Sequence, residues 1–477
     1  MNVLFVTSEC VPFFKLGGLG DVSYALPVAL QKLNINVRIV MPYYESINLP
    51  HQAKCVGQLA VDYDRRRELV FVFEIVIPGT HIPVYLFRHP KLNEYVGDDI
   101  AQTFAFFSKA VVSWYVLSSH LFGGPYDIIH CHDWHTALVP LLLGENRKVI
   151  QGKETTLQAR AARTILTIHN LLYQGETGVG VVLRLGLQKP QFHIFTTPLG
   201  RAVKLLREGL EYADMVTTVS PTYAREIARG HHGDSIQALL AKRKDRLVGI
   251  LNGIDTGIWN PKTDSLLPVH YSRGTVMTAK PELKAHLQKA LRLPSGDALL
   301  FGFVGRLEEQ QKGIELIIRA VPHLADRLFQ IAILGTGAAR QVKKLKKLAK
   351  RNPNITFIHT FDERLARRIY AGADVLLVPS KFEPCGLTQL IAMRYGTLPL
   401  VRKTGGLADT VVDGKTGFVF RQYTSAALAA KMREAIDLRR ENVSDWWKMV
   451  ASAMKQDFSW DMSAKKYLDL YQTILKT

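Results

Sequence analysis

The stretch that decides the fold of this chain is Lys15-Leu16-Gly17-Gly18-Leu19-Gly20-Asp21-Val22. The apolar run 3–6 before it is typical of a buried parallel strand, and the apolar residues of 22–33 after it recur at helical spacing. Glycines at a strand-to-helix turn let a ligand approach the backbone, and the unpaired amides of a helix start attract an anion. The stretch therefore predicts an anion-binding turn, with a helix that begins near Asp21.

A plainer interpretation of the same pattern is a tight connection between a strand and a helix. Gly17-Gly18-x-Gly20 lacks the G-x-G-x-x-G spacing of the dinucleotide fingerprint. Because Asp21 would repel a phosphate placed at the helix start, we expect it to cap the helix or to bind hydroxyl groups. Lys15 supplies a mobile positive charge at the edge of the loop.

The size and charge of the chain limit the classes of function that it can have. Its 477 residues are enough for two or three domains. The formal net charge of +19 fits either a nucleic-acid partner or an enzyme with an anionic substrate. The sequence shows neither an RNP motif, nor a zinc finger, nor interleaved aromatic and basic residues, so we expect no nucleic-acid partner. The basic run 343–351 is more simply a surface helix.

The four cysteines are scattered and form no C-x-x-C pair, which favours the reducing cytoplasm over a disulfide scaffold. We find no basic stretch followed by an apolar run at the N-terminus, so we expect no secretory signal. Since no apolar run reaches the roughly 18–20 residues that span a bilayer, we expect no membrane segment. Cys385 precedes a predicted helix, a position that favours a lowered thiol pKa.

Short strands alternate with helices in both halves, which predicts an α/β protein with two Rossmann-like, doubly wound parallel sheets. The periodicity lapses where Gly, Asn and Pro gather. We therefore expect an N-terminal domain over 1–248, a linker over 249–262, a second domain over 263–456 and a terminal helix over 457–477. Ligands bind beyond the carboxyl ends of parallel strands, so two such domains facing each other would form one deep cleft.

In the second half of the chain, four predicted strands are also followed by motifs that suit an anionic ligand. Each offers glycines, a helix N-terminus or a fixed cation, for which a phosphate-rich small ligand is the economical explanation. The motifs are Gly305-Arg306-Leu307 with Lys312-Gly313, Gly335-Thr336-Gly337, the run 379–389, and Lys403-Thr404-Gly405-Gly406-Leu407-Ala408-Asp409.

Histidines in the first half suggest a metal site at first sight. His130 and His132 share one face of a predicted strand, and His135 follows closely. No H-E-x-x-H motif or second ligand set accompanies them, so histidines satisfied by hydrogen bonds are favoured over zinc. We expect no metal and no other cofactor.

Taken together and in this order, the motifs resemble those of bacterial glycogen synthases and plant starch synthases over nearly the whole chain. The resemblance implies a retaining glycosyltransferase of the two-Rossmann-domain (GT-B) architecture. It implies transfer of glucose from ADP-glucose to the non-reducing end of an α-1,4-glucan such as glycogen. The further motifs that carry the resemblance are His132-Asp133-Trp134-His135, Thr167-Ile168-His169-Asn170 and Phe382-Glu383-Pro384-Cys385-Gly386-Leu387-Thr388-Gln389.

The resemblance also implies roles for residues of the first half. Lys15 would contact the phosphates of the donor, with Gly17 and Gly18 providing the backbone approach. Asp21 would contact the sugar or the nucleotide. Asp133 would lie near the acceptor, and His169 would face the transferred glucose.

For the second half, the resemblance implies that Arg306 and Lys312 bind the diphosphate as a cationic pair and that Glu383 bonds sugar hydroxyls. Cys385, Gly386, Leu387 and Thr388 would lie at a helix start that receives a phosphate, and Asn252 would also bind ADP-glucose. The terminal helix would return to the first domain and form part of a hinge.

One departure from the family pattern R-L-x-x-Q-K-G is an extra residue between Arg306 and Lys312. The flexible stem of a lysine tolerates a longer loop. For the chemistry we favour attack on the face from which ADP leaves, with Glu383 orienting the sugar, over a covalent glucosyl-Glu383 intermediate. Two other classes remain open: a transferase or phosphorylase-like enzyme with another donor, and a glucan-binding protein without activity.

Overall fold

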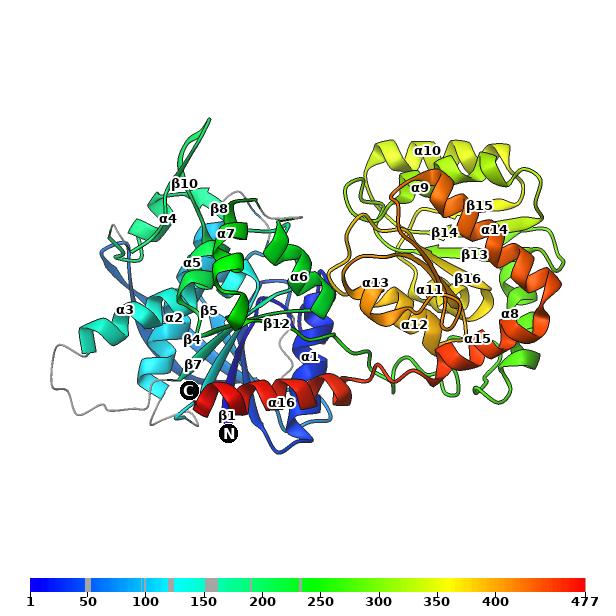
Figure 1. The fold of residues 1–477 in the computed structure, drawn as a ribbon. Helices are drawn as coiled ribbons and strands as arrows, with labels where there is room; N and C mark the ends of the chain where they lie inside the picture. The colour runs from blue at the N-terminus through cyan, green and yellow to red at the C-terminus, as the bar shows by residue number, and fades with distance from the viewer. Residues whose placement is uncertain are drawn as a thin grey trace. The chain divides into compact units, whose positions relative to one another are not determined.

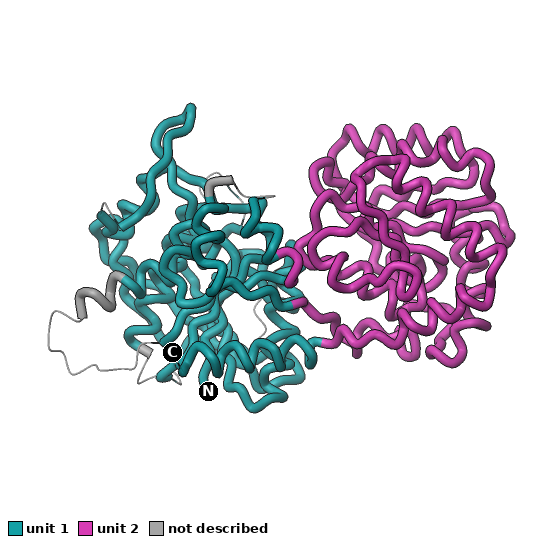
Figure 2. The backbone as a smooth tube through the Cα atoms, in the orientation of Figure 1, with its two compact units in different colours: residues 1–219, 224–250, 460–477 teal, residues 220–223, 251–459 magenta. Residues whose placement is uncertain are grey.

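The structure is a computed structural model that describes residues 1–47, 53–95, 97, 100–118, 124–150, 162–188, 191–230 and 234–476. The chain divides into two compact units (Figure 2). Unit 1 comprises Met1–Val219, Ala224–Ile250 and Trp460–Thr477, and unit 2 comprises Ser220–Tyr223 and Leu251–Ser459. Each unit is an α/β body built around its own sheet, as the alternation of strands and helices predicts.

Within the described residues, unit 1 contains a nine-stranded sheet in the order β12-β11-β7-β6-β1-β2-β5-β4-β3. The strands from β12 to β5 run parallel, and β4 and β3 extend the sheet antiparallel. The strands are β1 (Asn2–Val6), β2 (Asn36–Pro42), β3 (Lys54–Tyr63), β4 (Arg66–Val76), β5 (Pro83–Arg88), β6 (Ile128–His132), β7 (Arg163–Ile168), β11 (Met215–Thr218) and β12 (Leu247–Gly249).

A small antiparallel sheet in unit 1 has the order β8-β10-β9. Its strands are β8 (Glu176–Gly178), β9 (Phe195–Thr197) and β10 (Gly200–Lys204). The helices of this part of the chain are α1 (Gly18–Gln31), α2 (Ile100–Ser118), α3 (Leu138–Ile150), α4 (Gly180–Leu183), α5 (Leu205–Tyr212), α6 (Pro221–Arg229), α7 (Asp234–Lys242) and α16 (Trp460–Lys476), with 3-10 turns η1 (Pro90–Leu92), η2 (Trp134–Thr136) and η3 (Lys244–Arg246).

Helix α16 comes from the far end of the sequence and completes the core of unit 1. It packs against α1 (Figure 1), and its apolar face shares one buried cluster with β1 and β2. The hydroxyl of Tyr471 lies 2.8 Å from Nδ1 of His130 on β6. The chain therefore crosses back to the first unit, as the family resemblance implies.

Helix α2 is long and apolar enough over Ile100–Leu117 to cross a membrane, although the sequence pattern led us to expect no such segment. However, 56% of this segment is buried inside the protein. Phe104, Phe106 and Phe107 are fully covered, and they pack against aromatic side chains of unit 1. The apolar character of α2 is thus explained by a core position.

Unit 2 is built on a six-stranded parallel sheet in the order β15-β14-β13-β16-β17-β18. The strands are β13 (Leu299–Val304), β14 (Phe329–Leu334), β15 (Ile355–Ile358), β16 (Val375–Val378), β17 (Leu398–Arg402) and β18 (Phe418–Phe420). The helices are α8 (Val276–Leu291), α9 (Ile314–Ala320), α10 (Ala339–Arg351), α11 (Glu363–Gly372), α12 (Thr388–Arg394), α13 (Gly405–Thr410), α14 (Ser425–Glu441) and α15 (Val443–Lys455), with the 3-10 turn η4 (Val321–Leu324).

The basic run 343–351 lies on α10, which buries Val342 and Leu345 on one stripe, so the prediction of a surface helix is confirmed. We expected a linker over 249–262, but the structure assigns Leu251–Ser459 to unit 2. Arg367 explains this: its guanidinium lies 4.3 Å above the ring of Trp259 and donates to Ile258 and Asp264.

Candidate functional site

The glycine-rich turn joins β1 to α1 in unit 1, and its backbone is held by a glutamate. Helix α1 begins at Gly18, with Gly17 as the N-cap residue. The amides of Leu16 and Gly17 both donate to Oε2 of Glu9, each over 2.8 Å. The sequence pattern led us to expect that these backbone amides bind an anionic ligand. In the structure, they donate instead to a carboxylate of the protein itself. Glu9 carries no motif signal, which is why sequence reasoning missed it.

Lys15 and Asp21 form an ion pair across the same turn. Nζ of Lys15 lies 2.7 Å from the carboxylate of Asp21, and both side chains are about half exposed. The prediction that Asp21 caps the helix is wrong, because the helix begins three residues earlier and Asp21 lies in its first turn. Gly18 has nothing within 4 Å of the place that a Cβ would occupy, so its backbone is open.

A chain of hydrogen bonds joins the turn to the His132-Asp133-Trp134-His135 motif. The hydroxyl of Tyr95 donates to Oε1 of Glu9 over 3.1 Å and lies 3.0 Å from Nε2 of His135. His135 stacks on Trp134 with ring centroids 4.2 Å apart. Two motifs that are far apart in the sequence therefore share one network.

Asp133 directly follows β6 and has the backbone angle φ of 55°, an uncommon conformation for a residue other than glycine. Its Oδ1 accepts the amide of His169 over 2.6 Å. Burial raises the pKa of Asp133 to about 7, although the backbone amides of His169 and Asn170 act in the opposite direction. The structure thus brings Asp133 and His169 together, with a carboxyl group that titrates near neutral pH.

The histidines beside Asp133 form a buried stack. The rings of His130 and His132 lie 4.3 Å apart, and Nδ1 of His132 lies 2.9 Å from Nε2 of His169. Burial lowers the pKa of His130, His135 and His169 to about 3 and that of His132 well below its usual value. All four are therefore neutral at pH 7.

The prediction of satisfied histidines is confirmed for His130, which bonds Tyr471 and, over 2.6 Å, Oγ1 of Thr167. His132 and His135 each make one ring hydrogen bond, to His169 and Tyr95. Their second nitrogens, Nε2 of His132 and Nδ1 of His135, are buried without a partner among the residues that the structure describes. Within those residues no group of three His, Cys, Asp or Glu side chains is arranged to hold a metal ion.

In unit 2, the loops after β13 and β16 meet because these strands are neighbours in the sheet. Nζ of Lys312 lies 3.0 and 2.8 Å from the two carboxylate oxygens of Glu383. Ser380 also donates to Oε2 of Glu383, over 2.8 Å. Only 6% of the Glu383 side chain is exposed, so the lysine neutralises a nearly buried carboxylate.

The extra residue in the loop after β13 does not keep Lys312 from Glu383. The two glutamates of that loop pair with other cations: Glu308 with Arg306 over 2.9 Å, and Glu309 with Arg340 over 3.2 Å. Arg306 is more than half exposed. Each cation of the expected diphosphate-binding pair therefore contacts a carboxylate, and their joint binding of a diphosphate stays a prediction.

The run Cys385-Gly386-Leu387-Thr388 leads into α12, which begins at Thr388 with Leu387 as its N-cap residue. The side chain of Leu387 makes no capping hydrogen bond in the part of the chain that the structure describes. The backbone of Asn252 hydrogen-bonds Cys385, which brings Asn252 to the same place, with its side-chain oxygen buried and without a partner among the described residues.

The prediction of a reactive Cys385 is wrong, because burial raises the pKa of its thiol to about 12. The second Gly-Gly turn explains how tightly this loop is packed. A Cβ on Gly405 would overlap the carbonyl oxygen of Glu383, and one on Gly406 would overlap that of Cys385. These glycines therefore shape the loop that carries Glu383.

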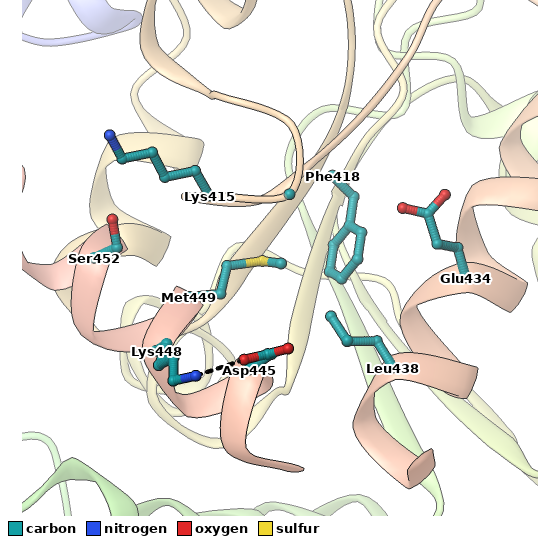
Figure 3. A pocket seen from close by; sticks show the side chains of 9 residues that line it. Lys415, Phe418, Glu434, Leu438, Asp445, Lys448, Met449 and Ser452 are labelled. Atoms are coloured by element: carbon teal, nitrogen blue, oxygen red, sulfur yellow. Dashed lines mark hydrogen bonds and ion pairs between the residues drawn. The ribbon is translucent and has the colours of Figure 1, made fainter. Parts of the chain in front are cut away.

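A hollow of about 510 Å³ lies elsewhere in unit 2, between β18, α14 and α15 (Figure 3). Phe418, Leu438 and Met449 form its apolar part, and Lys448 and Asp445 pair at its rim over 2.8 Å. None of the predicted site residues lines this hollow.

The expected residues thus gather at two places, each at the carboxyl ends of parallel strands. In unit 1 the turn after β1 and the ends of β6 and β7 carry Lys15, Asp21, Asp133 and His169, and in unit 2 the ends of β13 and β16 carry Arg306, Lys312 and Glu383. Two Rossmann-like units with cations and carboxylates at these strand ends are typical of glycosyltransferases of the GT-B class.

Comparison with known proteins specifies the family. The family description "Starch synthase catalytic domain" matches residues 2–242, and "Glycosyl transferases group 1" matches 287–448. The glycogen synthase of Francisella tularensis subsp. novicida is 37% identical over 500 residues, which cover 100% of this chain and 99% of that protein. The chain belongs to the glycogen synthase and starch synthase family.

Solved structures agree with this assignment. The catalytic domain of starch synthase IV from Arabidopsis thaliana, bound to ADP and acarbose, has a TM-score of 0.87 and 30% identity, with 100% of this chain and 99% of that chain covered. The sucrose-phosphate synthase of Thermosynechococcus elongatus shares the fold, with a TM-score of 0.62, 18% identity, and 100% and 99% of the two chains covered. This chain is a glucosyltransferase of the starch and glycogen synthase type.

Proposed function

We propose that this chain transfers glucose from ADP-glucose to the non-reducing end of an α-1,4-glucan, with retention of configuration and release of ADP, in glycogen biosynthesis. The observation that carries the proposal is the contact between Lys312 and Glu383 at the carboxyl ends of two neighbouring strands. Family membership supports it, as does the ADP bound in the Arabidopsis relative.

The charges in unit 2 suit a diphosphate leaving group. As the bond between C1 of glucose and the phosphate oxygen breaks, negative charge grows on the phosphate, and Arg306 and Lys312 are the cations proposed to stabilise it. The amides at the start of α12, next to Gly386, are proposed to bind a phosphate oxygen. Lys15 is proposed to contribute from unit 1.

The surroundings of Glu383 favour an orienting role. Both of its carboxylate oxygens contact Lys312, and Ser380 donates to one of them. These bonds hold the carboxylate in place and lower its reactivity as a nucleophile. In the proposed step, the acceptor O4 bonds to C1 on the face that ADP leaves, and its proton passes to the departing phosphate oxygen. Trapping a glucosyl-Glu383 ester would contradict this mechanism.

Residues of unit 1 are proposed to bind the sugars. Asp133 holds the amide of His169, and the two residues together offer a carboxyl group and a neutral imidazole to hydroxyl groups. We propose Asp133 for the acceptor, His169 for the transferred glucose and Asp21 for the donor. Gly17, Gly18, Asn252, Cys385, Leu387 and Thr388 complete the proposed binding set.

We propose that the reaction needs neither a metal ion nor another cofactor, because lysine and arginine supply the positive charge at the phosphates. The proposed location is the cytoplasm, which suits four cysteines that form no disulfide. The proposed partners are ADP-glucose and glycogen, without nucleic acid or membrane.

Measuring ADP release from ADP-glucose with glycogen present tests the proposal, in buffer with EDTA and in parallel with UDP-glucose. We expect ADP release that requires glycogen, persists in EDTA and exceeds UDP release. Faster release of UDP would identify a transferase with another donor. Retention on glycogen without any nucleotide release would identify a glucan-binding protein instead.

A further inference from the structure

The inference concerns the contact between His132 and His169 and rests on the proposed function of His169. His132 ends β6, and His169 directly follows the neighbouring strand β7. Nδ1 of His132 and Nε2 of His169 lie 2.9 Å apart, which is a hydrogen-bond distance. Both rings are neutral at pH 7, because burial lowers their pKa values. One of the two nitrogens therefore carries the proton, and the other accepts it.

The unpartnered nitrogen of His132 decides which ring donates. Nε2 of this ring is buried and has no partner among the described residues. If His169 donated, the single proton of His132 would have to lie on Nε2, as a buried N–H without an acceptor. Such orphaned donors are rare in folded proteins because they lose their bond to water without replacement. The lower-energy arrangement has the proton of His132 on Nδ1.

In His135, too, the hydrogen-bond partners determine which ring nitrogen carries the proton. The hydroxyl of Tyr95 donates its proton to Glu9, so the oxygen of Tyr95 is left to accept from Nε2 of His135. The proton of His135 therefore lies on Nε2, and its buried, unpartnered Nδ1 carries no proton. In both rings the nitrogen without a partner is the one without a proton.

We propose that His132 is a positioning residue, whose Nδ1–H donates to Nε2 of His169 and thereby fixes the His169 proton on Nδ1. His132 is fully buried, whereas His169 is partly exposed, so His169 is the member of the pair that a ligand can reach. Its backbone amide is fixed as well, by Asp133. His169 thus presents one donor of defined position, suited to an acceptor oxygen of a sugar hydroxyl or ring.

The direct test is 15N NMR of the ligand-free wild-type protein with labelled histidine, where chemical shifts distinguish protonated from bare ring nitrogens. Assignment comes from the loss of signals in His169→Gln. We expect a protonated Nδ1 and a bare Nε2 on His169 at pH 7.5. A protonated Nε2 on His169 would overturn the proposal. This measurement needs no activity, so its outcome is separate from that of the ADP-release assay, whose failure would reject the proposed function alone.

Two nearly isosteric variants test the effect on catalysis. In His132→Asn an amide N–H replaces the Nδ1 donor, whereas in His132→Asp a carboxylate can only accept and favours a proton on Nε2 of His169. We expect kcat of the Asp variant to fall at least about tenfold below that of the Asn variant at pH 7.5, with a smaller change in KM for ADP-glucose. Its activity should recover as pH falls, because the carboxylate at position 132 raises the pKa of His169 above its wild-type value, and protonated His169 carries a proton on both nitrogens.

The matched control is His130→Asn, which disturbs the same ring stack but has no hydrogen bond to His169. We expect it to lower thermal stability while the kcat of the folded enzyme and the His169 spectrum stay unchanged. Equal kcat values and parallel pH profiles for the Asn and Asp variants of His132 would show a merely structural role and overturn the proposal.

Discussion

Lys312 and Glu383, which are 71 positions apart in the sequence, contact each other through both carboxylate oxygens, at 3.0 and 2.8 Å. The lysine side chain is 22% exposed and the glutamate 6%, so the pair is largely removed from water. Breaking such a pair leaves an uncompensated charge, whereas replacing both partners does not. The contact therefore links the stability of this site to its proposed chemistry.

This link predicts different effects on stability and on activity. Lys312→Met should lower kcat by about 10²–10³-fold, because one cation at the leaving phosphate is lost. It should also destabilise the protein by up to about 3–5 kcal/mol, because Glu383 is left unpaired. The double variant with Glu383→Gln should regain stability without regaining activity. Thermal unfolding and ADP release measure the two effects, and full activity of Lys312→Met would contradict the prediction.

The carboxylate of Glu9 holds two amides of the glycine-rich turn, so Glu9→Ala should loosen that turn. We expect faster hydrogen exchange at Leu16 and Gly17 and a KM for ADP-glucose raised about tenfold, equivalent to roughly 1.4 kcal/mol. Glu45→Ala, at a surface glutamate that bonds Asn93, is the control. Unchanged exchange in Glu9→Ala would contradict the role of this carboxylate.

Two glycines should respond differently to the same substitution. Gly406→Ala places a Cβ on the carbonyl oxygen of Cys385 and should destabilise unit 2 by about 1–3 kcal/mol. Gly18→Ala adds a methyl group in open space and should leave the unfolding temperature unchanged or raised, while it weakens donor binding. Equal unfolding temperatures for the two variants would contradict the assignment of Gly406 to packing.

Acid should destabilise unit 1. His130, His135 and His169 stay neutral in the folded state down to a pKa of about 3 but protonate near pH 6.5 when unfolded, so stability falls as pH drops below 6.5. Each contributes a slope of up to about 1.4 kcal/mol per pH unit. The pKa of Asp133 is raised from its ordinary value to about 7, so between these two pH values protonation of Asp133 stabilises the folded state. This effect comes from one group, whereas three histidines act in the destabilising direction.

Thermal unfolding between pH 4.5 and 8 measures this slope. We expect the unfolding temperature to fall toward pH 4.5, and to fall less steeply in His130→Asn, which removes one titrating ring. A profile that is flat below pH 6.5 would contradict neutral buried histidines.

The thiol of Cys385 should react slowly with iodoacetamide at pH 8, because burial raises its pKa to about 12 and little thiolate forms. Cys55 is exposed and serves as the internal reference. Mass spectrometry of timed digests gives the two rates. We expect Cys55 to react at least about 10²-fold faster, and comparable rates would contradict the assignment.

Much of the fold could be predicted because apolar runs dominate the central strands. The runs 3–6, 299–304 and 330–334 are buried on both sides of their sheets, so they stand out in the sequence. The small sheet of β8, β9 and β10 was missed. Its strands have three to five residues and mostly partial exposure, which leaves no periodic signal.

The site was predictable where a motif lies within one loop and was missed where it depends on contacts across the chain. Asp133 and His169 follow neighbouring strands, so their proximity is implied by sheet topology. Glu9 accepts hydrogen bonds from the glycine-rich turn, and burial raises the pKa of Cys385. Both features depend on which groups surround a side chain after folding. Spacing along the sequence carries no information about burial of that kind.

Helix α16 makes the order of synthesis matter for this enzyme. Residues 460–476 leave the ribosome after the whole of residues 251–459, yet they supply buried side chains of unit 1 and the hydroxyl that bonds His130. Part of the core of nascent unit 1 therefore stays uncovered until unit 2 has been translated. Unit 2 has no such dependence on later residues, so it is the part of the chain that can finish folding first.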